Sequence, residues 1–199
     1  MCSRSIGSVT NVAKTEPGAT AAVVGLGGVG LAVIQGLVLS GAATIIGIDP
    51  VAERRDRAIK LGATLTIDSA DADLRQHVSA ATGRIGCDYV FDTVSSTLTT
   101  RLASDILRAG GKVVLIGVTG EPQSLGMSSM DLVMRQKSVV GSFLGNCHSQ
   151  RDLPKYLALC SAGRLDLAAL VTAIRPLSEI NTAMSELRAG RGVRTVLSM

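Results

Sequence analysis

The chain has 199 residues and a formal net charge of +4, and 46% of its residues are hydrophobic although only 2% are aromatic. This length is enough for one large domain, and a core of aliphatic residues and glycine is typical of parallel strands covered by helices rather than of a β-sandwich. The arginines are scattered, apart from Arg54, Arg55 and Arg57, and no aromatic residues lie between these three to stack on bases. We therefore expect a solvated helix face there and no nucleic-acid binding.

Three other general features argue against a membrane or an oxidising compartment. The nearly uncharged run 19–39 contains five glycines, which favour a buried strand and helix over a membrane span. No signal peptide is expected, because polar and small residues follow Arg4. The four cysteines are widely spaced without a C-x-x-C pair, so we expect reduced thiols in a cytoplasmic protein. They are Cys2, Cys87, Cys147 and Cys160.

The first elements predict a dinucleotide site. An apolar strand over 21–24 leads directly into Gly25-Leu26-Gly27-Gly28-Val29-Gly30 and then into a helical pattern over 29–39. Gly25 lets the chain turn off the strand, Gly27 leaves room for a pyrophosphate, and Gly30 lets helix and strand pack closely. The N–H groups that open the helix would face the phosphates.

The second strand ends at an acidic residue. Residues 44–48 form a largely β-branched run that is followed by Asp49. At this position a carboxylate accepts hydrogen bonds from both hydroxyls of the adenosine ribose and repels a 2′-phosphate. The sequence therefore predicts NAD rather than NADP as the ligand.

The same alternation of strand and helix continues as far as residue 143. We expect strands at 64–67, 88–91, 112–116 and 138–143, with helices through Arg57 and Lys60, over 72–81, and over 98–107, the last stopped by Gly110 and Gly111. Six such strands predict a doubly wound parallel sheet of order 3-2-1-4-5-6, an α/β fold. Its crevice would be ringed by Gly25, Asp49, Thr93, Val94, Gly117 and Val118.

The pattern changes after residue 145. We predict a helix over 153–161, a short strand over 168–172, a helix over 178–189 and a strand over 193–197. These elements do not extend the rhythm of the sheet. The expected organisation is a domain over 1–145 and a small α+β extension over 146–199.

Several longer strings indicate a family. The runs TEPGATAAVVGLGGVGLAVIQG, IIGIDP, KLGAT, DYVFDTV, GGKVVLIGV and LSEINTAMSELRAGRGVRTVLSM follow one another. In this order the chain resembles the C-terminal, NAD-binding half of zinc-dependent medium-chain alcohol dehydrogenases, without their N-terminal catalytic domain. The resemblance places Asp49 and Arg54 at the adenosine ribose, Thr93 and Val94 beside the cofactor, Ile116, Val118 and the Leu144 backbone around the nicotinamide, and Arg194 at the pyrophosphate.

The resemblance also implies a zinc site that is incomplete here. The family stabilises an alkoxide with a zinc ion held by two cysteines and a histidine. Cys2 is either the one remaining ligand or a terminal thiol, because its spacing to the helix over 5–14 is about two residues short of the family pattern. Cys147 and His148 are adjacent and more consistent with a loop than with a metal pair, and His77 is expected to face solvent. No residue is a candidate general acid or base.

The function predicted from these patterns is NAD binding for hydride transfer between an alcohol and an aldehyde or ketone. The isolated chain is expected to bind NAD without turnover, since its zinc site is incomplete. The alternatives are a stand-alone NAD(H)-binding regulatory module, a subunit completed by a separate chain, and an S-adenosylmethionine methyltransferase, against which Gly30 argues. In the family, the strand that corresponds to 138–143 builds a dimer, so we expect a homodimer through this apolar edge.

Overall fold

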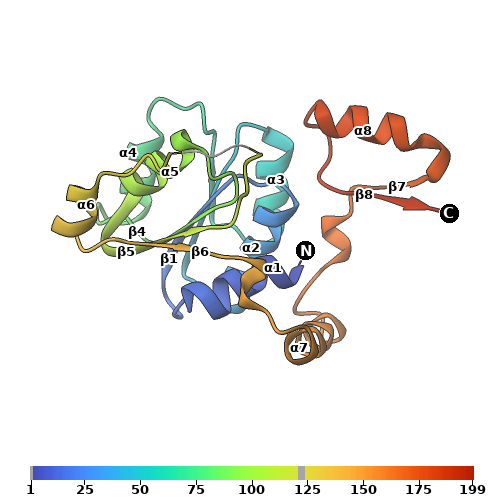
Figure 1. Ribbon diagram of the computed structural model, residues 1–199, viewed down its shortest axis with the longest axis horizontal. Coiled ribbons are helices and arrows are strands. Elements are labelled where there is room, and N and C mark those ends of the chain that lie inside the picture. The colour runs from blue at the N-terminus through green and yellow to red at the C-terminus, as the bar shows by residue number, and fades with distance from the viewer. Residues whose placement is uncertain (1, 121–123) are drawn as a thin grey trace.

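The computed structural model describes residues 2–120 and 124–199, with side chains from residue 4 onward in the first segment. Its centre is a parallel sheet of six strands in the order β3-β2-β1-β4-β5-β6, shown in Figure 1. This order confirms the predicted doubly wound fold. The strands are β1 (Thr20–Val24), β2 (Thr44–Ile48), β3 (Leu65–Ile67), β4 (Cys87–Asp92), β5 (Leu107–Leu115) and β6 (Ser138–Gly141).

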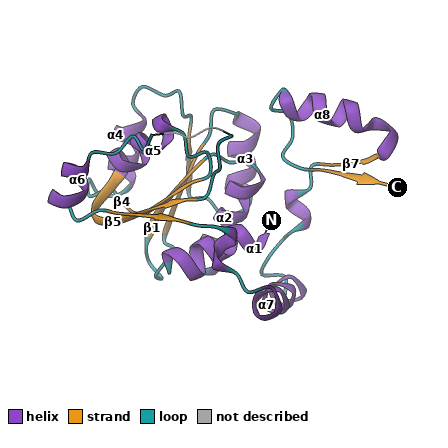
Figure 2. Ribbon diagram, viewed as in Figure 1, coloured by secondary structure: helices purple, strands orange, loops and turns teal. Residues whose placement is uncertain are grey.

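Helices cover both faces of the sheet, as Figure 2 shows. Side chains alternate between the faces along each strand, so Val23 points into one apolar cluster while Val24 points into the other. The first cluster is closed by α2 (Gly28–Leu39) and Ala58 of α3 (Ala52–Lys60), and the second by α4 (Leu74–Ala81) and α5 (Thr97–Ile106). Both faces are therefore buried, in agreement with the largely apolar sequences of the central strands.

The N-terminal helical segment packs beside the end of the sheet. Helix α1 (Cys2–Gly7) continues as the π-helical segment η1 (Ser8–Ala13), and together they contact α2 and the short turn η2 (Leu144–Asn146) that follows β6. The helix expected over 5–14 is therefore present, although its second half is wider than an α-helix.

The C-terminal residues form the predicted α+β extension. Helix α7 (Ser149–Ser161) leads through η3 (Ala168–Leu170) to a separate two-stranded parallel sheet, drawn in orange and red in Figure 1. The predicted strand over 168–172 is wrong, because Leu170 turns into the first core cluster and strand pairing begins only at Ala173 opposite Thr195. This sheet consists of β7 (Ala173–Pro176) and β8 (Thr195–Ser198), connected by η4 (Leu177–Glu179) and α8 (Ile180–Arg188).

Three further differences from the prediction concern β5, β6 and the segment between them. Gly110 and Gly111 lie inside β5 and do not stop a helix, because α5 ends at Ile106 and the strand starts at the next residue. The expected strand over 138–143 ends at Gly141, and Phe143 lies exposed beyond it. The short helix α6 (Ser129–Met134) was not predicted, and none of its residues is buried.

Candidate functional site

The glycine turn between β1 and α2 lies at the carboxyl end of the sheet. Gly25 has a φ of +86°, a left-handed conformation that favours glycine. A Cβ on Gly30 would lie 1.9 Å from the carbonyl oxygen of Gly25, so helix and strand approach too closely for any side chain. A Cβ on Gly27 would meet no atom within 4 Å. The turn therefore has the sharp bend, the open face and the close packing expected of the three glycines.

Asp49 ties the end of β2 to this turn. Its side chain is only 3% exposed, and its Oδ2 accepts a hydrogen bond of 2.7 Å from the backbone N–H of Leu26. Its Oδ1 accepts a second bond of 2.9 Å from the N–H of Val51. Because each carboxylate oxygen has two lone pairs, both oxygens can still accept from a hydroxyl donor.

The prediction of a solvated arginine face holds for Arg57, which pairs with the exposed Glu53 at 3.0 Å, but not for Arg54 and Arg55. Arg54 Nη1 lies 3.8 Å from Asp49 Oδ2, and Arg54 Nη2 donates to the carbonyl oxygen of Gly190 in the C-terminal extension. Arg55 donates to the main-chain oxygen of Asp49 and pairs with Asp68 at 3.0 Å. The guanidinium groups of Arg54 and Arg55 are half-buried. Their contacts link the ends of β2 and β3 to each other and to the C-terminal extension.

The end of β4 closes the crevice beside the glycine turn. The Thr93 hydroxyl donates to the carbonyl oxygen of Val24 or of Gly25. A Cβ on Gly25 would lie 2.6 Å from this hydroxyl, so Thr93 occupies the space that the glycine leaves. Val94 is exposed at the rim of the crevice.

Asp92 organises two of the turns around the crevice and was not singled out in the sequence. Its Oδ1 accepts from the N–H groups of Val94 and Ser95, and its main-chain oxygen accepts from Ile116 and Gly117. The side chain is fully buried, and this burial raises its pKa, although the N–H groups of Ser95 and Val94 oppose the shift. An acidic residue at the end of an apolar strand was the signal that could have identified it.

The residues expected near a nicotinamide lie at the ends of β5 and β6. Ile116 is buried and Val118 is 83% exposed, while a Cβ on Gly117 would lie 2.6 Å from the main chain of Thr93 and Val94. Leu144 is 48% exposed and has a φ of +50°. One further bond lies just beyond the end of β6 at Gly141, where the Ser142 N–H donates to the carbonyl oxygen of Leu115.

A slot of about 400 Å³ with both apolar and polar walls opens at the same end of the sheet and was also not predicted. It extends from the end of β1 across to the start of α5. Leu98 and Leu102 are one helical turn apart on α5, which was the available sequence signal. The apolar residues that line the slot are Val24, Ala72, Leu74, Leu98 and Leu102, and the polar ones are Ser69, Asp71, Arg75, Ser96 and Thr99.

Arg194 lies in the extension between α8 and β8. Its main-chain oxygen accepts from the N–H and the hydroxyl of Thr172, which fixes the segment beside β7. Gly190 lies four residues earlier and accepts from Arg54, so this segment reaches the Asp49 side of the crevice.

Metal ligands are not gathered in the part of the chain that the structure describes, where no three His, Cys, Asp or Glu side chains could hold an ion together. The side chain of Cys2 lies outside the described residues. Cys147 Sγ lies 3.3 Å from the Tyr156 hydroxyl, and His77 pairs with Asp71 at 3.2 Å. Burial raises the pKa of the Cys87 thiol to about 12.

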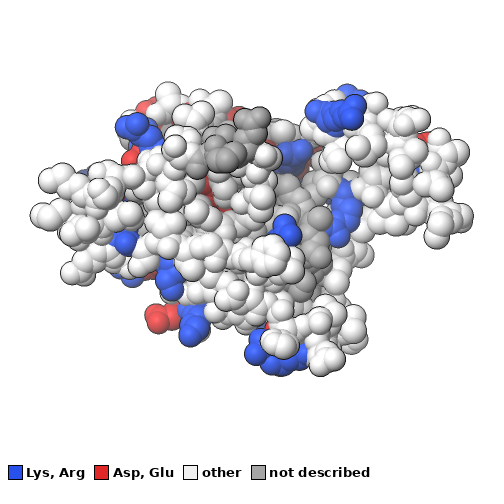
Figure 3. All heavy atoms as spheres, viewed as in Figure 1, with Lys and Arg blue, Asp and Glu red and all other residues white. Residues whose placement is uncertain are grey.

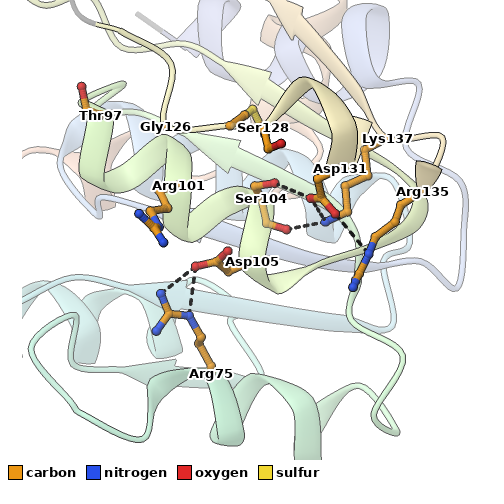
Figure 4. Close-up of a pocket in the computed structure, with 11 residues that line it drawn as sticks. Arg75, Thr97, Arg101, Ser104, Asp105, Gly126, Ser128, Asp131, Arg135 and Lys137 are labelled. Carbon is orange, nitrogen blue, oxygen red and sulfur yellow. Dashed lines mark hydrogen bonds and ion pairs between the residues drawn. The ribbon is translucent and has the colours of Figure 1, made fainter. Parts of the chain in front are cut away.

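A groove of about 900 Å³ lies along α5 and α6 and does not include the glycine turn or Asp49. Figure 4 shows that Arg75, Arg135 and Lys137 in this groove face acidic partners. Arg75 pairs with Asp105 at 2.6 Å, and Lys137 pairs with Asp131 at 2.8 Å.

On the face in Figure 3, the Lys and Arg side chains are scattered rather than joined in one patch. The described residues also include no helix long and apolar enough to cross a membrane.

Comparison with known proteins finds a matching family model and several related proteins. The model of the zinc-binding dehydrogenase family matches residues 28–162. The Schizosaccharomyces pombe protein named probable S-(hydroxymethyl)glutathione dehydrogenase 1 is 36% identical over 195 residues, which are 97% of this chain and 51% of the relative. The chain spans about half the length of the curated relatives it matches.

Solved structures agree with this result. An alcohol dehydrogenase from Aeropyrum pernix is 28% identical with a TM-score of 0.84, and the similarity covers all of this chain and 56% of that one. An alcohol dehydrogenase from a Thermus species is 27% identical with a TM-score of 0.90 and the same coverage.

Proposed function

Because the chain belongs to the zinc-binding dehydrogenase family, we propose that it binds NAD and holds the nicotinamide for hydride transfer between an alcohol and an aldehyde or ketone. The observation that carries this proposal is the open Gly27 face beside the buried Asp49 carboxylate. A pyrophosphate needs such an approach to the N-terminus of α2, and an adenosine ribose needs such an acceptor.

The other residues fit an extended dinucleotide. The apolar wall of the slot at Leu98 and Leu102 suits an adenine ring, and Arg194 would pair with the pyrophosphate. Ile116, Val118 and the backbone of Leu144 would contact the nicotinamide. When bound, NAD supplies the carbon that accepts or donates the hydride, and these residues exclude water and fix the orientation of the ring.

The proposal does not extend to zinc in this chain. The described residues offer no set of three ligands, so they do not fit the ion of the family. We expect the purified chain to bind NAD without turnover. Formation of NADH from a primary alcohol on addition of zinc would contradict this expectation.

Calorimetric titration with NAD and NADP tests the cofactor. Asp49→Asn should weaken NAD binding by about tenfold or more, since hydrogen bonds from ribose hydroxyls to a charged acceptor are replaced by weaker ones. It should narrow the preference for NAD over NADP, because the repulsion of a 2′-phosphate is lost. Asp68→Asn is the control for loss of a carboxylate that pairs with an arginine, since Asp68 follows the neighbouring strand and pairs with Arg55 outside the glycine turn. No NAD binding by the folded wild-type chain would refute the proposal.

A second candidate function is that of a subunit completed by a separate chain, or of an NAD(H)-responsive module that acts through a partner. The apolar surface of the extension favours it, because large side chains of α7, β7, β8 and α8 are exposed. They include Leu153, Leu157, Ile174, Leu187 and Val196. Co-purification of a zinc-containing chain that restores alcohol oxidation would favour the completed subunit.

A further inference from the structure

The turn η2 has an unusual backbone. Three consecutive residues, Leu144, Gly145 and Asn146, have φ angles of +50°, +67° and +47°. Most L-amino acids avoid this left-handed region, which asparagine tolerates better than most, so Leu144 in particular is held there against its own preference. The bonds within the turn, from Asn146 N–H to Phe143 and from Cys147 N–H to Leu144, are 3.1 and 3.4 Å long.

The segment α1–η1 holds this turn from the side. The Asn11 amide nitrogen lies 3.2 Å from the carbonyl oxygen of Gly145 and 3.4 Å from that of Asn146. The Thr10 hydroxyl donates either to the carbonyl oxygen of Ile6 at 3.1 Å or to Asn11 Oδ1 at 3.2 Å, and the second bond orients the amide with its NH₂ group toward the turn. One side chain therefore binds two carbonyl groups that the left-handed backbone turns outward.

Two further contacts show that this packing is close. Ser8 and Ser142 share a buried hydrogen bond of 2.7 Å between their hydroxyl groups. A Cβ on Gly7 would lie 2.4 Å from the carbonyl oxygen of Gly145 and from Cys147 Sγ, so only glycine allows the approach. Asn11 lies on the π-helical segment η1, where the wider turn changes the direction of the side chains relative to an α-helix.

We propose that Asn11 is a positioning residue that holds the left-handed turn Leu144–Asn146 so that the Leu144 backbone faces the nicotinamide end of the cofactor. This inference rests on the proposed function. Asn11 acts through the turn, and it is the only side chain that binds two of its carbonyl groups among the contacts of the described residues.

The test compares two ligands that differ at one end. NADH contains the nicotinamide, whereas ADP-ribose contains the adenosine, the pyrophosphate and both riboses without it. Asn11→Asp has nearly the same shape but cannot donate, and its carboxylate repels the two carbonyl groups. We expect Asn11→Asp to weaken NADH binding by about tenfold and ADP-ribose binding by less than about twofold. Asn11→Gln, which keeps the donor, should recover part of the NADH affinity, and Asn181→Asp on α8 is the control for the added charge.

Each outcome separates this inference from the proposed function. Unchanged NADH binding by Asn11→Asp would overturn the role of Asn11 and leave the NAD site intact. Equal weakening of both ligands, with a lower midpoint of thermal unfolding, would show a purely structural role and would also overturn it. A folded wild-type chain that binds neither ligand would refute the NAD proposal itself, and this inference with it.

Discussion

Two glycines of the turn after β1 differ in the space around them, so alanine substitutions should separate folding from ligand binding. At Gly30 a Cβ would lie 1.9 Å from the Gly25 carbonyl oxygen, and we expect Gly30→Ala to lower the free energy of unfolding by about 3 kcal/mol. At Gly27 a Cβ meets nothing within 4 Å and φ is −70°, so Gly27→Ala should leave stability within about 0.5 kcal/mol. The same methyl group lies where the pyrophosphate would approach and should reduce NAD affinity at least about tenfold.

Urea unfolding and calorimetry on the same preparations check both halves of this prediction. A Gly27→Ala chain that binds NAD as well as the wild type would show that the open face is not the path of the pyrophosphate. A Gly30→Ala chain with unchanged stability would show that the close approach of α2 to β1 is not needed for folding.

Two carboxyl groups should give pH dependences of opposite sign. Burial raises the pKa of Asp92, so the native state binds its proton more tightly than the unfolded chain does. Its ionisation therefore reduces stability as the pH rises from the unfolded pKa of about 4 through the raised native value. For Asp131, the hydrogen bond from Lys137 is the main cause of a lowered pKa, so its contribution is present above pH of about 4 and is lost as the pH falls through the native pKa.

The variants Asp92→Asn and Asp131→Asn isolate the contribution of each carboxyl group to the free energy of unfolding. Urea unfolding is measured from about pH 3.5 to about pH 7, which covers most of the range in which carboxyl groups ordinarily titrate. The stability of Asp92→Asn relative to wild type should rise with pH, and that of Asp131→Asn should fall. Asp92→Asn also places an amide nitrogen in a buried site, which lowers stability at every pH but leaves the slope. Parallel slopes for the two variants would contradict the assignment.

At the scale of single elements, the sequence predicted those segments whose pattern follows from local burial. The alternation of apolar runs and glycine turns identified all six strands, because the parallel strands are buried on both faces and leave a continuous apolar run. The prediction failed where tertiary contacts override the local sequence pattern. Leu170 lies in an apolar run but turns into a core built by α2, and Gly110 continues a strand because β4 pairs on either side of it.

The candidate site was predictable only in part for the same reason. Gly25, Gly27, Gly30 and Asp49 have roles that depend on local geometry and fixed spacing. Asn11 acts on a turn more than 130 residues away, as the separation of its hydrogen-bonded partners shows, and no local pattern reports such a contact. Residues of this kind became visible only when the chain was folded.

The edge strand β6 predicts self-association. It ends the sheet order, and the neighbouring helix α6 exposes Met130, Val133 and Met134. We propose a homodimer in which two β6 edges pair and the α6 side chains pack beside them. The double variant Met130→Glu with Val133→Glu should convert the dimer to a monomer in light scattering at micromolar concentration. Ile174→Glu with Val196→Glu changes equally apolar residues of the extension and is the control. A wild-type monomer would contradict the proposal.

At the scale of the whole molecule, the C-terminal extension, called the lobe below, is attached to the sheet domain more firmly at its start than at its end. Its base is firm, because the Gln35 side chain exchanges two hydrogen bonds with the main chain of Asp166, and Leu170 is buried in the core. Beyond this base, β7 and β8 pair only with each other among the described residues, and Arg54 of α3 binds the carbonyl oxygen of Gly190. A two-stranded sheet alone is marginally stable, so this lobe should open without unfolding the rest of the chain.

Hydrogen exchange measured by mass spectrometry tests this uneven stability and the role of Arg194 together. Without ligand, amides of β7 and β8 should exchange about 100-fold faster than those of β1 and β4, which lie at the centre of the sheet. If Arg194 pairs with the pyrophosphate, saturating NAD should slow exchange in β8, because bound phosphate then ties the lobe to the sheet domain. Arg194→Gln should abolish this slowing while leaving the protection of β1 unchanged, and Arg188→Gln, an exposed arginine at the end of α8, should keep it. Equal protection by NAD in Arg194→Gln and wild type would show that the lobe closes through other contacts. Arg54 would then be the residue to substitute next, since its half-buried side chain already joins Asp49 at the end of β2 to Gly190 of the lobe.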